Sequence, residues 1–65
     1  MTLPTLNEMS ETAAKIRKLA YCAAHTVATG NGLDAENADL AARMAAKDAE
    51  DQFLATMDRI FKNAR

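Results

Sequence analysis

Residues that break helices stand at only two places in this chain of 65 residues. Pro4 lies near the start, and Gly30, Asn31 and Gly32 interrupt the middle. Glycine and proline are the strongest local breakers of regular structure, so the segments between them are free to form long helices. The pattern predicts an all-α fold with helices at about residues 5–29 and 34–62, joined by a turn at residues 30–33. A connection this short is typical of an antiparallel two-helix hairpin.

Capping residues mark where each helix should begin and end. Thr5 and Glu8 have the spacing of a capping box, in which each side chain accepts a hydrogen bond from a free backbone N–H. Asp34 is a favourable N-cap for the second helix. Gly30 suits the left-handed position that ends the first helix. We therefore expect a single helical-hairpin domain over residues 1–65.

The apolar residues of the first helix recur at alternating steps of three and four, which is the a and d spacing of a heptad. The predicted seam consists of Leu6, Met9, Ala13, Ile16, Ala20, Ala23 and Val27. The second helix carries two apolar stripes on separate sides. The first stripe should pack on the first helix and consists of Ala35, Ala38, Ala42, Ala45, Ala49, Phe53, Met57 and Ile60. The second stripe consists of Leu33, Leu40, Met44, Leu54 and Phe61.

A lone hairpin can bury only one stripe of each helix, so the second stripe would lie in water. Burying a Leu, Met or Phe side chain contributes about 1.5–3 kcal/mol, and several exposed ones therefore favour association. We expect the second stripe to cover either a homodimer interface or a docking surface for another protein. A core this small rarely stabilises a fold alone, and two hairpins forming a four-helix bundle would enlarge it.

The charge balance is nearly neutral, with 8 basic and 9 acidic residues and a net charge of −1. It gives no reason to expect nucleic acid or an anionic membrane as the default partner. The uncharged stretch at residues 19–33 contains His25 and two glycines, so it is too short and too polar to span a bilayer. Residues 1–7 lack the features of a signal peptide, and Cys22 is the single cysteine. We expect a soluble, cytoplasmic protein.

Catalytic and metal-binding patterns are weak. Cys22 and His25 lie three residues apart, but a structural zinc site takes four ligands. The acidic cluster of Asp48, Glu50 and Asp51 would need a pocket that shifts its pKa values before it could do acid–base chemistry. We expect an ordinary salt-bridged surface, with i,i+4 pairs at Glu11–Lys15, Asp39–Arg43, Lys47–Asp51 and Asp58–Lys62. The sequence thus predicts no enzyme, no cofactor and no metal site.

Basic side chains give the first helix a mild positive character through Lys15, Arg17 and Lys18. A hairpin dimer with such a face is similar, in architecture and composition only, to the Rop family of helical hairpins that bind RNA. The similarity implies an RNA-binding regulatory dimer as an alternative function. In this chain Lys15, Arg17 and Lys18 would then contact the RNA.

Residues 39–47 resemble the first helix of a helix-turn-helix motif. Ala45, however, stands where such motifs usually carry glycine, and alanine favours a continuous helix. Asp48 and Glu50 would face the phosphates and repel them. We therefore expect no DNA binding.

The leading hypothesis is a non-enzymatic protein-interaction factor that forms a homodimer and inhibits or modulates a larger protein. A transcriptional regulator is one plausible target, by analogy with small phage and plasmid inhibitors. The expected contact residues are Leu40, Met44, Leu54 and Phe61, with Arg43, Lys47 and Asp51 at the rim. A structural, self-assembling subunit is a further alternative.

Overall fold

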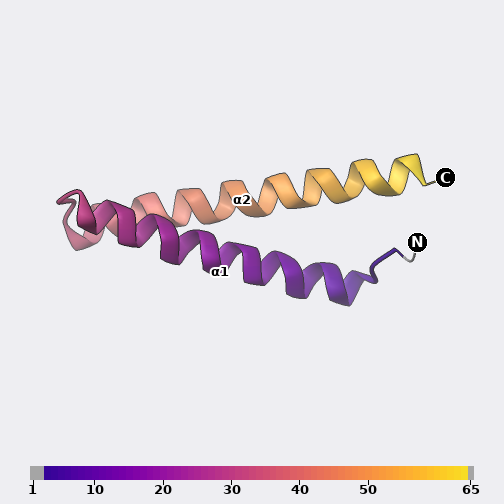
Figure 1. Ribbon diagram of the computed structural model, residues 1–65, viewed down its shortest axis with the longest axis horizontal. Helices are drawn as coiled ribbons and strands as arrows, with labels where there is room; N and C mark the ends of the chain where they lie inside the picture. Colours follow the sequence, from indigo (N-terminus) through magenta and orange to yellow (C-terminus); the bar gives the residue numbers. More distant parts are fainter. Residues whose placement is uncertain (1–2, 65) are drawn as a thin grey trace.

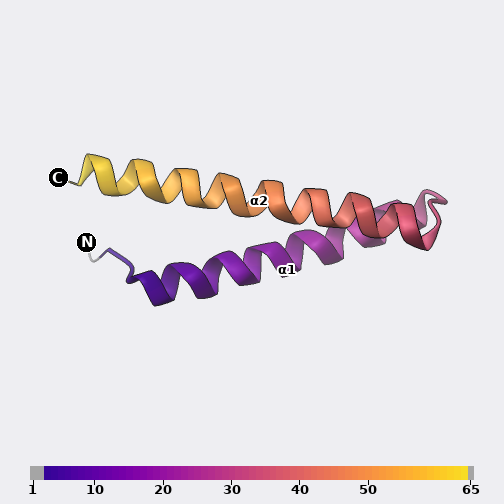
Figure 2. The same ribbon diagram turned by 180° about the vertical axis from the view of Figure 1, so that it is seen from behind.

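Two long helices form the whole ordered framework of the computed structural model, which describes residues 3–64. Helix α1 spans Leu6–Gly30 and helix α2 spans Ala35–Asn63. They pack side by side in opposite directions, so the start of α1 and the end of α2 lie at the same end of the hairpin (Figures 1 and 2). The molecule measures 48 × 17 × 15 Å. The domain expected over residues 1–65 includes residues 1, 2 and 65, which lie outside the described part.

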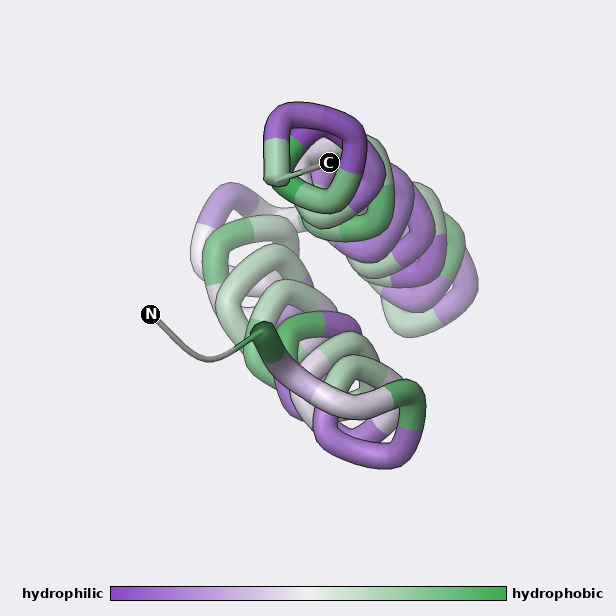
Figure 3. The backbone as a smooth tube through the Cα atoms, turned by 90° about the vertical axis from the view of Figure 1, so that its right-hand side faces the viewer, coloured by the Kyte–Doolittle hydropathy of each residue, from purple (hydrophilic) through white to green (hydrophobic). Residues whose placement is uncertain are grey.

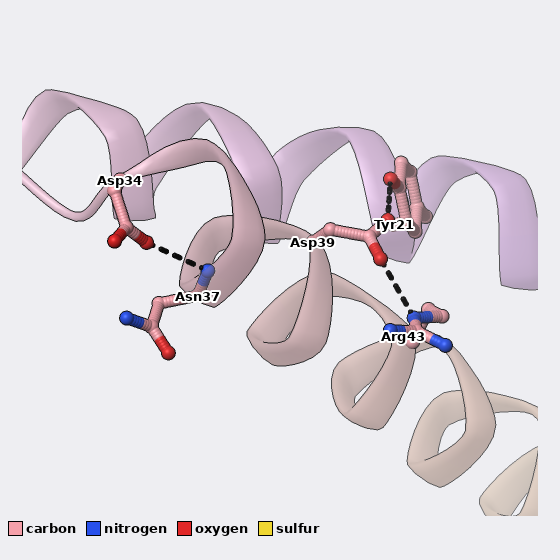
Figure 4. Close-up of polar contacts among 5 residues, drawn as sticks. All are labelled: Tyr21, Asp34, Asn37, Asp39 and Arg43. Atoms are coloured by element: carbon pink, nitrogen blue, oxygen red, sulfur yellow. Dashed lines mark hydrogen bonds and ion pairs between the residues drawn. The ribbon is translucent and has the colours of Figure 1, made fainter.

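Both helix starts form as predicted. The Thr5 hydroxyl accepts a hydrogen bond from the Glu8 N–H at 3.1 Å, and the Glu8 carboxylate accepts one from the Thr5 N–H at 3.2 Å. These reciprocal bonds satisfy two N–H groups that the helix itself leaves free. At α2 the Asp34 carboxylate accepts from the Asn37 N–H at 2.9 Å (Figure 4).

Helix α1 ends within one residue of the prediction, but the left-handed residue predicted at Gly30 lies two residues later. Gly30 is still helical, and Gly32 takes the left-handed conformation, with φ of 90°. The Leu33 N–H donates to the Ala28 carbonyl and the Gly32 N–H to the Thr29 carbonyl, each at 3.1 Å. This pair of bonds is the Schellman arrangement, which closes the last turn of a helix. Gly32, the second glycine of the turn, therefore supplies the left-handed residue that closes α1.

Alanines form the core between the helices. The buried residues are Ala13, Ala28, Ala38, Ala42 and Ala46, and within residues 3–64 no large side chain is fully buried. Small side chains allow the helices to approach closely near the turn. Toward the chain ends the half-buried Met9, Phe53 and Met57 fill the interface, and the ribbons diverge there (Figure 1). The hairpin thus has a thin core.

The predicted seam of α1 is correct only from Met9 to Ala20. There Met9, Ala13, Ile16 and Ala20 are buried or half-buried. Ala23 is exposed, as are Leu6 and Val27, which expose 79% and 62% of their surface. Ala24 and Ala28 take the inner positions instead. A helix of 3.6 residues per turn drifts about 20° per heptad away from a 3.5-residue repeat, so the contact line moves round α1.

The first stripe of α2 faces α1 over most of its length. Ala38 and Ala42 are buried, and Ala45, Ala49, Phe53 and Met57 are half-buried. The prediction is wrong at both ends, where Ala35 is exposed and Ile60 exposes 39% of its surface. Phe61 is half-buried in place of Ile60 and follows Phe53 and Met57 at i+4 spacing. Along both helices, hydrophobic and hydrophilic residues follow one another within each turn (Figure 3).

Candidate interaction surfaces

The outer side of α2 carries large apolar side chains in water. Leu40, Met44 and Leu54 expose 49%, 66% and 46% of their surface, and Leu33 exposes 42%. These four residues are called the outer stripe below. Phe61, also predicted for this stripe, is instead half-buried, because it continues the side of α2 that carries Phe53 and Met57. The outer stripe therefore lacks the C-terminal member that the sequence predicted.

Charged side chains flank the outer stripe. Three of the predicted i,i+4 ion pairs form: Asp39–Arg43 at 2.8 Å, Lys47–Asp51 at 3.7 Å and Asp58–Lys62 at 3.0 Å. The predicted pair between Glu11 and Lys15 is absent from the ion pairs of the described residues, and Glu11 and Lys15 both lie exposed. Ion pairs this exposed contribute little to stability. The side chains of Arg43, Lys47 and Asp51 stay 66%, 77% and 60% exposed despite these pairs.

A polar contact between the helices joins Tyr21 to Asp39. The Tyr21 hydroxyl donates a hydrogen bond to the Asp39 carboxylate, and Arg43 donates to the same carboxylate at 2.8 Å (Figure 4). The ring of Tyr21 stacks on His25, with centroids 5.8 Å apart. Tyr21 and Asp39 are 18 residues apart. Sequence reasoning missed this contact, because only the register of the two helices brings the residues together.

This contact changes the acidity of both partners. The hydrogen bond from Tyr21 lowers the pKa of the Asp39 carboxyl below its ordinary 3.8; partial burial opposes the effect, and the positive charge of Arg43 reinforces it. The same hydrogen bond raises the pKa of the Tyr21 hydroxyl above its ordinary 10.0, since an ionised phenol would face the carboxylate. The pair thus favours a neutral tyrosine beside an ionised aspartate.

An open groove of about 660 Å³ runs between the helices on the side of Tyr21. Its polar lining consists of Arg17, Lys18 and Tyr21 from α1 and Arg43, Lys47, Glu50 and Asp51 from α2. Arg17 approaches Glu50 across the groove at 3.9 Å. We call this feature the basic groove. The sequence predicts Arg17 and Lys18 for RNA binding, and Arg43 and Lys47 for the rim of a protein contact. The groove brings all four together. Lys15, the third residue predicted to contact RNA, is not part of the lining.

The side of α1 opposite the basic groove is apolar. Leu19 and Ala23 follow Arg17 and Tyr21 by two residues, which places them about 200° around α1 from the basic groove. By the same spacing Ala41 and Ala45 of α2 point away from Asp39 and Arg43. Together with Val27 these residues form the alanine-rich face, whose members are Leu19, Ala23, Val27, Ala41 and Ala45. Leu19 and Val27 expose 70% and 62% of their surface.

The sequence contained a signal for the alanine-rich face that the heptad pattern concealed. Residues 19–33 carry no acidic side chain, lysine or arginine, so this part of α1 presents no formal charge apart from any on His25. The heptad assignment placed Ala23 and Val27 in the intramolecular seam, where the structure does not place them.

The described part of the chain contains no cluster of side chains suited to hold a metal ion. Within residues 3–64 no group of three or more His, Cys, Asp or Glu side chains converges as metal ligands would. Cys22 is exposed and His25 is half-buried against Tyr21. Neither helix is long and apolar enough over its described residues to cross a membrane.

Comparison with protein-family models, with curated proteins and with solved structures finds no match. The surfaces of the hairpin are therefore the basis on which its function is inferred.

Proposed function

We propose that the chain is a non-enzymatic protein-interaction factor, which forms a homodimer and binds a larger protein, such as a transcriptional regulator, to inhibit or modulate it. The observation that carries this proposal is the outer stripe. Leu40, Met44 and Leu54 each keep about half or more of their surface in water. Apolar side chains at helical spacing, bordered by charges, are the usual form of an anchor for a partner helix or groove.

The energetics favour a partner on the outer stripe. Fully burying a Leu or Met side chain is worth about 1.5–3 kcal/mol, so covering the exposed halves of three such residues contributes several kcal/mol. Arg43, Lys47 and Asp51 would surround these anchors. Such rim charges act mainly on the association rate and on the choice of partner.

The alanine-rich face is the proposed seam of the homodimer. A two-fold interface uses the same patch on both subunits, so the apolar members of this face would meet their own copies. Its alanines allow helices of two copies to approach closely. A dimer built in this way is a four-helix bundle that leaves the outer stripe open.

Substitution of Leu54 by glutamate tests the proposed function. Leu54→Glu places a charge in the outer stripe and should abolish capture of the partner by tagged protein. Asn7→Glu is the matched control, because it adds the same charge at an exposed position in the first turn of α1, away from the outer stripe, and it should leave capture unchanged. The measurement is quantitative mass spectrometry of proteins bound from a nuclease-treated lysate.

Two outcomes contradict the proposal. If both variants retain the same bound proteins as the wild type, the outer stripe does not bind a partner. If every bound protein disappears after nuclease treatment, the captured material was held through nucleic acid. Circular dichroism of each variant excludes loss of helicity as the cause of lost capture.

A further inference from the structure

The basic groove combines four cations that are far apart in the sequence. Arg17 and Lys18 reach it from α1, and Arg43 and Lys47 reach it from α2. Two carboxylates, Glu50 and Asp51, also line it, and a third, Asp39, pairs with Arg43 at 2.8 Å. Four cations and three carboxylates leave these side chains with a net charge of +1. The whole chain, in contrast, carries a net charge of −1. The groove is therefore a local positive region on a slightly acidic protein.

The cations of the basic groove are exposed, and a short ion pair holds one of them, Arg43, at 2.8 Å from Asp39. The side chains of Arg17, Arg43 and Lys47 expose 65%, 66% and 77% of their surface. The ion pairs of Arg17 and Lys47 are long, at 3.9 and 3.7 Å, so water already solvates most of both groups. Lys18 is exposed, and the ion pairs within residues 3–64 do not include it. A ligand carboxylate could pair with these groups at little desolvation cost.

The length of the groove matches a short helical segment. Its α2 lining runs from Arg43 to Asp51, which corresponds to about 12 Å or about two helical turns at 1.5 Å per residue. Met44 follows Arg43 directly in the chain and exposes 66% of its surface. Apolar surface thus borders the cations along the same edge of α2.

We propose that the basic groove binds an acidic, amphipathic helical segment of the partner protein, with its carboxylates on the groove cations and its apolar side on Met44 and Leu40. This inference rests on the proposed function and names the chemistry of the partner. The mixed lining favours a protein segment over nucleic acid. A continuous phosphate backbone would pass beside Glu50 and Asp51, whereas carboxylates spaced along a helix can avoid them.

The test measures binding of a synthetic peptide by fluorescence anisotropy. The probe is a labelled amphipathic helix with one row of glutamates and one row of leucines, and its partner probe carries glutamines in place of the glutamates. Wild-type protein should bind the glutamate peptide more tightly than the glutamine peptide, and added salt should weaken only the former.

Charge reversals locate the site. Lys18→Glu combined with Lys47→Glu should weaken binding of the glutamate peptide by about tenfold or more, because two attractive contacts become repulsive. Lys15→Glu combined with Lys62→Glu changes the net charge equally but lies outside the groove lining. This control should weaken binding by less than about threefold, since only long-range screened charge is altered. A gentler pair, Lys18→Gln with Lys47→Gln, should give an intermediate loss.

Several outcomes would overturn the groove proposal. These are equal binding of the two peptides, equal loss in the groove variant and its control, or no binding by the wild type. Tighter binding of a labelled RNA stem-loop, with Lys15→Glu weakening it as much as Lys18→Glu, would assign the cations to nucleic acid instead. If Leu54→Glu still abolishes capture of the partner while the groove variant retains it, only the groove proposal fails.

Discussion

Tyr21 and Asp39 form the polar contact that relates α1 to α2 most directly. The residues lie 18 positions apart, and their hydrogen bond is possible only at one register and one rotation of the two helices. Rotating either helix by one residue would turn a side chain by about 100° and separate the pair. Arg43 holds the Asp39 carboxylate from the other side at 2.8 Å. Alanines alone would fix the register less well, because their contacts are similar at each turn.

Replacing Tyr21 by phenylalanine tests this role. Tyr21→Phe removes the hydroxyl but keeps the ring that stacks on His25. The thermal midpoint of unfolding at neutral pH should fall, because Asp39 loses its donor on α1. The measurement is circular dichroism at 222 nm during heating. An unchanged midpoint would show that the contact does not stabilise the hairpin.

The same pair makes stability depend on pH in two directions. Folding lowers the pKa of Asp39, so its contribution is complete above the ordinary 3.8 and is lost as the pH falls through the folded value. Folding raises the pKa of Tyr21, so its contribution is complete below the ordinary 10.0 and is lost as the pH rises through the folded value. Thermal midpoints of the wild type should therefore decline beyond both limits. Tyr21→Phe should remove the alkaline decline attributable to this pair and reduce the acid one.

At the scale of the elements, the sequence predicts the existence of the helices better than the line along which they meet. Thr5, Glu8 and Asp34 mark the starts of α1 and α2 through local hydrogen bonds, which depend only on nearby residues. The contact line depends on how far the helical period departs from a heptad over the whole of α1. That accumulated drift explains why Ala28 is buried and Val27 exposed.

The candidate surfaces also divide into features set by one helix and features set by the packing of both helices. The exposure of Leu40, Met44 and Leu54 could be predicted, because their separation from the packing stripe is a property of α2 alone. The basic groove could not be predicted, because it requires Arg17 and Arg43 to be placed on the same side of the hairpin. That placement depends on the register between the two helices.

The two glycines of the turn should respond to substitution in opposite directions. Gly30 is helical, and an added Cβ would meet no atom within 4 Å. Gly30→Ala should therefore stabilise the hairpin by about 0.5–1 kcal/mol. Gly32 has φ of 90°, which strains any residue with a Cβ, so Gly32→Ala should destabilise it by about 1–2 kcal/mol. Urea denaturation measures both; destabilisation by Gly30→Ala would contradict this account of the turn.

At the scale of the whole molecule, the hairpin is a slender unit with little of its apolar surface enclosed. Its described residues include five buried alanines and no fully buried large side chain, while Leu6, Leu19, Val27 and Met44 each expose more than half of their surface. Covering such side chains is worth more than the alanine core alone supplies. A second copy on the alanine-rich face and a partner on the outer stripe would enclose most of them. The proposed assembly thus assigns separate occupants to separate sides of one hairpin.

Sedimentation equilibrium of the wild type, Leu19→Glu and Leu54→Glu tests this division most directly. Leu19 and Leu54 expose 70% and 46% of their surface in the single hairpin, so neither substitution should unfold it. We predict a dimeric wild type at micromolar concentrations, a dimeric Leu54→Glu variant and a monomeric, helical Leu19→Glu variant. A monomeric wild type, or dissociation caused by Leu54→Glu but not by Leu19→Glu, would contradict the account.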